Sequence, residues 1–137
     1  MKKEERRPDL PRRRILIMDD DEVFSRFMQR ALDHLAYDAA IAGDGATAVE
    51  LYRKSLESGK PFDAVIIDLR ILGGMGGEET IKRLVEIDPG VKAVASSGYS
   101  DDPLIVNYGQ YGFRGAIAKP YTMEELAGTL EKILTEA

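Results

Sequence analysis

Five short apolar runs recur along the chain, and a longer amphipathic segment follows each of them. The runs are mostly apolar and too short for helices, which predicts buried strands. They cover residues 15–18, 38–42, 64–67, 91–95 and 115–118. The segments between them carry apolar residues at helical spacing. Strands and helices that alternate in this way predict an α/β fold, a (βα)5 doubly wound parallel five-stranded sheet with helices on both faces.

Four of the five predicted helices have an apolar face that should point to the core. The expected inward residues are Val23, Phe24, Phe27, Met28, Ala31, Leu32 and Leu35 in the first helix, Ala48, Val49, Tyr52 and Leu56 in the second, Ile81, Leu84 and Val85 in the third, and Met123, Leu126, Leu130, Ile133 and Leu134 in the last. Thr122 and Glu125 have the spacing of a capping box. The fourth helix, which starts at Asp102-Pro103, contains Gly109 and is expected to be the least stable.

Polar residues stand directly after four of the predicted strands. Asp19 and Asp20 follow the first strand, Asp68 the third, Ser97 the fourth and Lys119 the fifth. The carboxyl ends of parallel strands share one edge, so these side chains should meet in a crevice where the acids repel one another unless a cation lies between them. Oxygen ligands suit Mg²⁺, with Mn²⁺ a possible substitute, and the hydroxyl and ammonium suit phosphoryl oxygens. The arrangement suggests phosphoryl transfer onto a carboxylate.

Length and composition limit the classes of protein that fit. A chain of 137 residues with 44% hydrophobic content suits one domain. The chain contains no cysteine, which excludes disulfides, thiolate nucleophiles and zinc–thiolate sites. No apolar run is long enough to span a membrane, and the N-terminus lacks the apolar centre of a secretory signal. We therefore expect a cytoplasmic protein without membrane contact.

Charge is distributed unevenly along the chain. Residues 1–14 hold seven Lys/Arg and three Asp/Glu, whereas the whole chain has a net charge of −5. The acidic body argues against binding to nucleic acid. Pro8 and Pro11 interrupt the basic segment, so residues 1–12 are interpreted as a flexible lead-in or linker and residues 13–137 as the folded domain.

Four motifs together carry a family resemblance. Ile15–Glu22, Val65–Leu69, Ser97-Gly98 and Lys119-Pro120, in this order and spacing, resemble the receiver domain of two-component response regulators over about residues 13–136. The glycine-rich loop after the third strand and the sequence of residues 96–100 look like those of receivers attached to hybrid sensor kinases. The resemblance implies a flavodoxin-like sheet with strand order 2-1-3-4-5.

The resemblance also implies a phosphoacceptor and its metal site. Asp68 would accept a phosphoryl group from a histidine kinase or a histidine phosphotransfer protein. Asp20 and Asp68 would ligate Mg²⁺ together with the backbone carbonyl of Arg70, and Asp19 would act largely through metal-bound water. Such a protein would not be an enzyme in the usual sense, because it catalyses only its own phosphorylation and dephosphorylation.

The same resemblance assigns a switch. Ser97 and Lys119 would contact the phosphoryl oxygens. Asp68 and Lys119 would be the catalytic residues. A downstream protein would dock near the fourth helix, the fifth strand and the fifth helix. Where many receivers carry a switch aromatic this chain has Ala116, so aromatic rotamer switching is not expected there.

The loop after Asp68 departs from the usual family pattern. Ile71-Leu72 replaces the common pair that ends in proline, and the glycine-rich stretch 73–77 looks one residue longer than usual. Loss of proline and gain of glycine free the backbone, so we expect an unusually mobile loop.

Other interpretations are open. Asp19 to Glu22 could simply cap a helix, although capping needs one such residue. Lys119 could be an ordinary surface lysine and Ser97 an ordinary turn residue. Asp19-x-Asp21 also matches the core of haloacid dehalogenase-type aspartyl-phosphate phosphatases, but Glu22-Val23 follows where that family expects Gly-Thr. A flavin-binding carrier would share the sheet, yet three successive aspartates would repel its phosphate.

Overall fold

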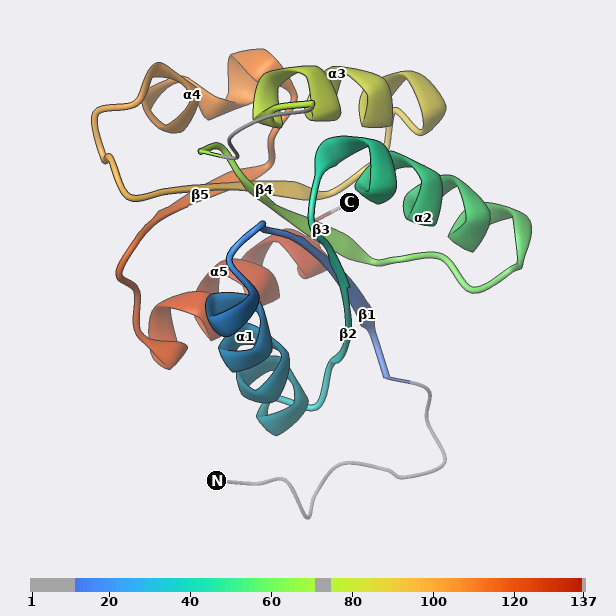
Figure 1. The fold of residues 1–137 in the computed structure, drawn as a ribbon, viewed down its shortest axis with the longest axis horizontal. Helices are drawn as coiled ribbons and strands as arrows, with labels where there is room; N and C mark the ends of the chain where they lie inside the picture. The colour runs from blue at the N-terminus through green and yellow to red at the C-terminus, as the bar shows by residue number, and fades with distance from the viewer. Residues whose placement is uncertain (1–11, 71–74, 137) are drawn as a thin grey trace.

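A five-stranded parallel sheet forms the middle layer of the protein (Figure 1). The computed structural model describes residues 12–70 and 75–136. Its strands are β1 (Arg14–Met18), β2 (Asp38–Ala42), β3 (Ala64–Asp68), β4 (Ala93–Ser97) and β5 (Gly115–Ala118). They are arranged in the order β2-β1-β3-β4-β5, and every neighbouring pair is parallel. The predicted fold class and strand order are therefore confirmed.

Helices cover both faces of the sheet. They are α1 (Glu22–His34), α2 (Gly45–Glu57), α3 (Gly77–Ile87), α4 (Pro103–Val106) and α5 (Met123–Thr135), with a 3-10 helix, η2 (Tyr108–Tyr111), after α4. Side chains alternate along β1, so Ile15 and Ile17 pack with α1 and α5, whereas Leu16 and Met18 pack with α2 and α3. Figure 1 shows α1 and α5 on one face of the sheet and α2 and α3 on the other. The two apolar clusters therefore lie on opposite faces.

Side-chain caps fix where several helices begin. The Asp21 carboxylate accepts the Phe24 N–H at 3.0 Å, and the Asp44 carboxylate accepts the Thr47 N–H at 2.8 Å. The capping box of Thr122 and Glu125 is present as predicted. Because Asp21 alone caps α1 with its side chain, Asp19 and Asp20 are left for another role.

The first helix does not bury its whole apolar stripe. Val23 and Phe27 are 80% and 57% exposed, which corrects the expectation that they face the core. Successive helical residues turn by about 100°. Met28 and Leu32 lie in the middle of the helix face that packs on the sheet, and Val23 and Phe27 therefore lie outside that face. Leu56 and Met123 are also exposed rather than inward.

The fourth strand starts later than its apolar pattern predicts. Val91 is buried, but its N–H donates to the carbonyl of Asp88 and closes the turn after α3. The strand therefore runs from Ala93 to Ser97 and includes both serines. The next helix, α4, is only four residues long and has no buried residue.

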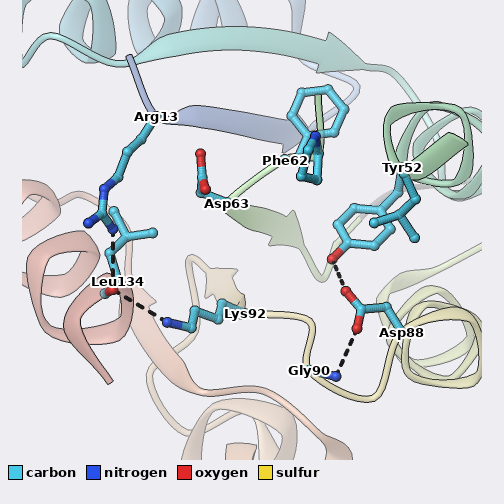
Figure 2. Close-up of a pocket in the computed structure, with 10 residues that line it drawn as sticks. Arg13, Tyr52, Phe62, Asp63, Asp88, Gly90, Lys92 and Leu134 are labelled. Atoms are coloured by element: carbon cyan, nitrogen blue, oxygen red, sulfur yellow. Dashed lines mark hydrogen bonds between the residues drawn. The ribbon is translucent and has the colours of Figure 1, made fainter. Parts of the chain in front are cut away.

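Hydrogen bonds join several elements at the amino-terminal edge of the sheet (Figure 2). The Tyr52 hydroxyl donates to Asp88 at 2.6 Å, which ties α2 to the turn after α3. Arg13 and Lys92 both donate to the carbonyl of Leu134, at 3.2 and 3.4 Å, and so hold the end of α5 against the sheet. These contacts stabilise the fold at the edge of the sheet opposite Asp19, Asp20 and Asp68.

We expect Tyr52→Phe to lower the free energy of unfolding by about 1.5–3 kcal/mol, because the lost hydrogen bond has a charged acceptor. Urea unfolding followed by circular dichroism measures the change. Tyr111→Phe is the matched control, since the Tyr111 hydroxyl makes no hydrogen bond within residues 12–70 and 75–136. Equal midpoints for the two variants would contradict a stabilising role for the Tyr52–Asp88 pair.

The contribution of the Tyr52–Asp88 pair to stability also depends on pH. Burial and then the bond to Asp88 raise the pKa of Tyr52 above its ordinary value. A raised folded-state pKa means that the pair's contribution is complete below pH of about 10, the unfolded value, and is lost as pH rises through the folded pKa.

Candidate functional site

Three aspartates meet at the carboxyl-terminal edge of the sheet. Carboxylate oxygens of Asp19, Asp20 and Asp68 all lie within 4.8 Å of one another. Asp19 and Asp20 directly follow β1, and Asp68 is the last residue of the adjacent strand β3. Neighbouring parallel strands that end on acids necessarily bring those acids together, so the predicted juxtaposition is present.

Asp19 is buried and held on all sides. Its N–H donates to the carbonyl of Ala42 at 2.9 Å, which continues the pairing between β1 and β2. One carboxylate oxygen accepts the Asp21 N–H at 2.9 Å, and the other lies 3.0 Å from the Lys119 ammonium. Asp20, in contrast, is exposed. The carboxylate of Asp19 is thus fixed, whereas that of Asp20 borders solvent.

Asp68 is buried with one oxygen fixed and the other less constrained. Its Oδ1 accepts the Arg70 N–H at 3.0 Å, and its Oδ2 lies 3.6 Å from the Lys119 ammonium. Burial is the main cause that raises the pKa of Asp68, and the charge of Asp19 adds to it, while the Arg70 N–H and the Lys119 charge oppose the shift. The ionised carboxylate is therefore less stable here than in water.

Lys119 reaches the cluster from the end of β5. Its ammonium contacts both Asp19 and Asp68 and lies 4.3 Å from the centre of the Phe24 ring. Its backbone N–H donates to the carbonyl of Ser97 at 2.7 Å. The position of the cation is thus set by two carboxylates, one aromatic face and the pairing of β4 with β5.

Ser97 is fully buried at the end of β4. Its hydroxyl accepts the Tyr99 N–H at 3.1 Å. The neighbouring Ser96, which pairs in register with Asp68, is also buried, and its hydroxyl has no hydrogen-bond partner within the described residues. β4 therefore ends with two serine hydroxyls, and that of Ser97 accepts a hydrogen bond from the loop that follows.

Two aromatic residues near the cluster were not predicted to belong to the site, and the sequence analysis gave one of them, Phe24, only as a core residue. Phe24 contacts Lys119, and the Tyr121 ring meets the Phe24 ring edge-on at 6.2 Å between centroids. Burial raises the pKa of Tyr121 to about 12. In the sequence, the only indication that Tyr121 lies near the site is its position two residues after Lys119. The fold shows in addition that α1 supplies the Phe24 ring that faces it.

Arg70 lies at the edge of the cluster, where its backbone N–H contacts Asp68 and its guanidinium stacks on Tyr99. The role of its carbonyl as a metal ligand stays a prediction. The expectations for Ile71-Leu72 and for the start of the glycine-rich loop fall on residues 71–74, outside the described residues. Ala116 lies half-buried in β5.

The chemistry of the donors fits a hard divalent cation. The three clustered side chains offer oxygen atoms only, two of them are buried, and the nearby ammonium balances part of their charge. Such a set suits Mg²⁺ or Mn²⁺ and disfavours softer metals that select nitrogen or sulfur.

The sequence model of the response regulator receiver domain family matches residues 15–131 of the chain. The chain belongs to this family. The receiver protein CpdR of Brucella abortus is 28% identical over 125 residues, which are 91% of this chain and 99% of CpdR. The transcriptional regulatory protein ZraR of Escherichia coli K12 is 30% identical over 120 residues, which are 88% of this chain but only 26% of ZraR.

Solved receiver structures have the same fold. A putative response regulator from Chloroflexus aurantiacus superposes with a TM-score of 0.82 at 23% identity, and the match covers 92% of this chain and 100% of that chain. The receiver domain of the sensor histidine kinase PA1611 from Pseudomonas aeruginosa gives a TM-score of 0.80 at 22% identity over the same shares. That structure contains a magnesium ion in its active-site cleft.

Family membership decides between the functions that the sequence left open. A receiver domain is a signalling module of two-component systems, with a phosphoacceptor role, and neither a haloacid dehalogenase-type phosphatase nor a flavin carrier is supported. Within the described residues, no helix is long and apolar enough to cross a membrane.

Proposed function

We propose that this receiver domain accepts a phosphoryl group on Asp68 from the phosphohistidine of a histidine kinase or a histidine phosphotransfer protein. The convergence of Asp19, Asp20 and Asp68 within 4.8 Å, with the Lys119 ammonium beside two of them, carries the proposal. Asp19, Asp20, Asp68 and the Arg70 carbonyl would hold Mg²⁺, or Mn²⁺ in its place. When bound, the metal would neutralise charge on the phosphoryl oxygens.

The contacts of the three acids favour Asp68 as the nucleophile. Both oxygens of Asp19 are engaged at 2.9 and 3.0 Å, and Asp20 is exposed at the rim. Asp68 has one oxygen oriented by the Arg70 N–H and a second oxygen with a longer contact of 3.6 Å. That second oxygen would form the O–P bond as the P–N bond of the donor breaks and the electron pair stays on the imidazole.

Ser97 and Lys119 would report the phosphorylated state. Ser97 ends β4, the strand next to that of Asp68, and Lys119 follows β5, the strand beyond it. The Lys119 N–H donates to the Ser97 carbonyl, so movement of one displaces the other. The elements between β4 and β5, α4 and η2, contain no buried residue. Their rearrangement would therefore break few packing contacts. A downstream partner would dock on α4, β5 and α5.

Catalysis would be limited to the domain's own phosphorylation and dephosphorylation. The acidic body, which argues against nucleic acid, supports output through protein contacts. The cytoplasmic location and the division into a lead-in of residues 1–12 and a domain of residues 13–137 stay predictions.

Incubation with phosphoramidate as a small phosphodonor tests the proposed function directly. We expect intact-mass spectrometry to show one added phosphoryl group in the presence of Mg²⁺ and none after chelation with EDTA. An acyl phosphate is cleaved by hydroxylamine, whereas a phosphoserine or phosphotyrosine ester is not, so hydroxylamine should remove the label. A label that persists would contradict a carboxylate acceptor.

Magnesium should also stabilise the folded domain. A ligand that binds only the folded state adds about 2.7 kcal/mol at about 100 times its dissociation constant. We expect this gain in thermal unfolding of the wild type and a much smaller one in Asp20→Asn, which loses an anionic donor.

Asp38→Asn is the matched control for the metal experiment, because Asp38 is an exposed aspartate at the opposite edge of the sheet. It should retain the full magnesium shift. Without the metal, Asp20→Asn should unfold no earlier than the wild type, since the substitution removes repulsion within the cluster. Equal magnesium shifts in Asp20→Asn and Asp38→Asn would exclude Asp20 as a ligand.

A further inference from the structure

We propose that the Ser96 hydroxyl donates a hydrogen bond to the phosphoryl group on Asp68 and so stabilises the phosphorylated state. The inference rests on the proposed function and adds to it a residue that it does not use. Ser96 is 2% exposed, and its hydroxyl has no hydrogen-bond partner within residues 12–70 and 75–136. Buried polar groups are nearly always hydrogen-bonded, so an unpaired hydroxyl beside a reactive carboxylate indicates an acceptor that is present in another state.

Ser96 lies beside Asp68 on the same face of the sheet. The two residues pair in register between the neighbouring strands β4 and β3. Side chains alternate along a strand, so Ser96 shares a face with Val94, and Asp68 shares a face with Ile66. Val94 and Ile66 belong to one apolar cluster, which packs with α1 and α5. Because neighbouring strands are about 4.8 Å apart, the hydroxyl is a near neighbour of the carboxylate.

The Tyr121 hydroxyl lies in the same buried region. It donates to Met28 Sδ at 3.3 Å, and a thioether sulfur is only a weak acceptor. Burial is the main cause that raises the pKa of Tyr121, and the Ser96 hydroxyl opposes the shift. The charges of Asp19 and Asp68 add to it. The phenol is therefore close to Ser96 and to both carboxylates, so Ser96 has polar neighbours although it has no hydrogen bond.

The other buried serines in the described part of the chain are paired. Ser25, Ser55 and Ser97 each make at least one hydrogen bond. Ser96 is the exception, and it is the buried serine that pairs in register with the proposed phosphoacceptor. The position of the unpaired hydroxyl therefore connects it with the chemistry of Asp68.

Phosphorylation would supply the missing acceptor. In the unphosphorylated domain, Asp68 Oδ1 accepts the Arg70 N–H, and Oδ2 lies 3.6 Å from the Lys119 ammonium. A phosphoryl group on Oδ2 would add strongly accepting oxygens next to Ser96. A serine side chain rotates between staggered rotamers, so the hydroxyl can turn to such an oxygen without movement of β4. A donor that is unpaired before phosphorylation and paired afterwards favours the phosphorylated state.

Beryllium fluoride with Mg²⁺ is a stable substitute for the phosphoryl group and allows an equilibrium test. We expect Ser96→Ala to weaken the binding of beryllium fluoride by about fivefold in isothermal titration calorimetry, the factor that one ordinary hydrogen bond supplies. Ser96→Thr keeps the hydroxyl and should bind with an affinity close to that of the wild type. Without ligand, Ser96→Ala should unfold at the wild-type temperature or above it, because alanine removes an unpaired polar group.

Ser55→Ala is the matched control, since Ser55 is also buried but its hydroxyl donates to the Tyr52 carbonyl and accepts the Phe62 N–H. It should lower the unfolding temperature and leave the affinity for beryllium fluoride unchanged. Unchanged affinity in Ser96→Ala would overturn the proposal. An equal loss of affinity in Ser96→Thr would also overturn it, because packing and not the hydroxyl would then be the cause. Absence of beryllium fluoride binding by the wild type would instead refute the proposed function.

Discussion

Asp68→Asn is expected to reduce covalent phosphoryl uptake by at least about a thousandfold, because the substitution removes the anionic nucleophile and leaves its surroundings in place. The asparagine has the same shape, and its carbonyl can still accept the Arg70 N–H that Asp68 accepts now. Buried Asp68 is also destabilised as a carboxylate, so its amide should fold at least as well. Intact-mass spectrometry after incubation with Mg²⁺ and phosphoramidate measures the effect.

Two controls make this result specific to Asp68. Asp38→Asn removes an exposed aspartate from the opposite edge of the sheet and should be labelled like the wild type. Thermal unfolding should show that Asp68→Asn remains folded. Labelling of Asp68→Asn at the wild-type rate would disprove the assignment, and peptide analysis of the labelled protein would then identify the acceptor.

The fold and the meeting of the acids could be predicted from the sequence for one physical reason. Strands buried on both faces appear as apolar runs, and a run that stops on an acid fixes that acid at the strand's carboxyl end. The parallel arrangement then places Asp19, Asp20 and Asp68 at one edge without any knowledge of side-chain contacts. Lys119 follows from the same rule, since it directly follows β5.

Other features depend on packing that periodicity does not record. Val23 and Phe27 continue the apolar pattern of α1, but the sheet contacts a narrower face than that pattern covers. Val91 is as apolar as a strand residue, yet its N–H closes a turn and β4 starts two residues later. Patterns of apolar residues indicate burial, and burial alone distinguishes neither a strand from a turn nor one side of a helix from its flank.

The sequence analysis did not predict the contacts between aromatic rings and cations. Phe24 and Lys119 are far apart in the chain and meet because α1 begins and β5 ends at the same edge of the sheet. Arg70 and Tyr99 meet because the neighbouring strands β3 and β4 end at the same level. The sequence signal for such pairs is their offset from strand ends. Tyr99 and Arg70 each stand two residues beyond a site residue, so the register of β3 with β4 brings them together.

Lys119→Ala is expected to separate phosphoryl uptake from switching. Asp68 keeps its nucleophilic oxygen and the N–H of Arg70, so the variant should still be labelled. It loses the ammonium that now links the end of β5 to Asp19 and Asp68. A charge-assisted contact contributes about 1.5–3 kcal/mol, so the phosphorylation-dependent equilibrium should weaken by roughly 10- to 100-fold.

Hydrogen exchange in β4, α4 and β5, measured with and without the phosphoryl group, reports this equilibrium. The wild type and Lys82→Ala, which removes an exposed lysine from α3, should change exchange on phosphorylation, whereas labelled Lys119→Ala should change little. Unlabelled Lys119→Ala should exchange faster near Asp19, because the carboxylate there loses its cation. A full phosphorylation-dependent change in Lys119→Ala would remove the lysine from the switch and leave Ser97, bonded through its carbonyl to the same strand end, as the group that transmits it.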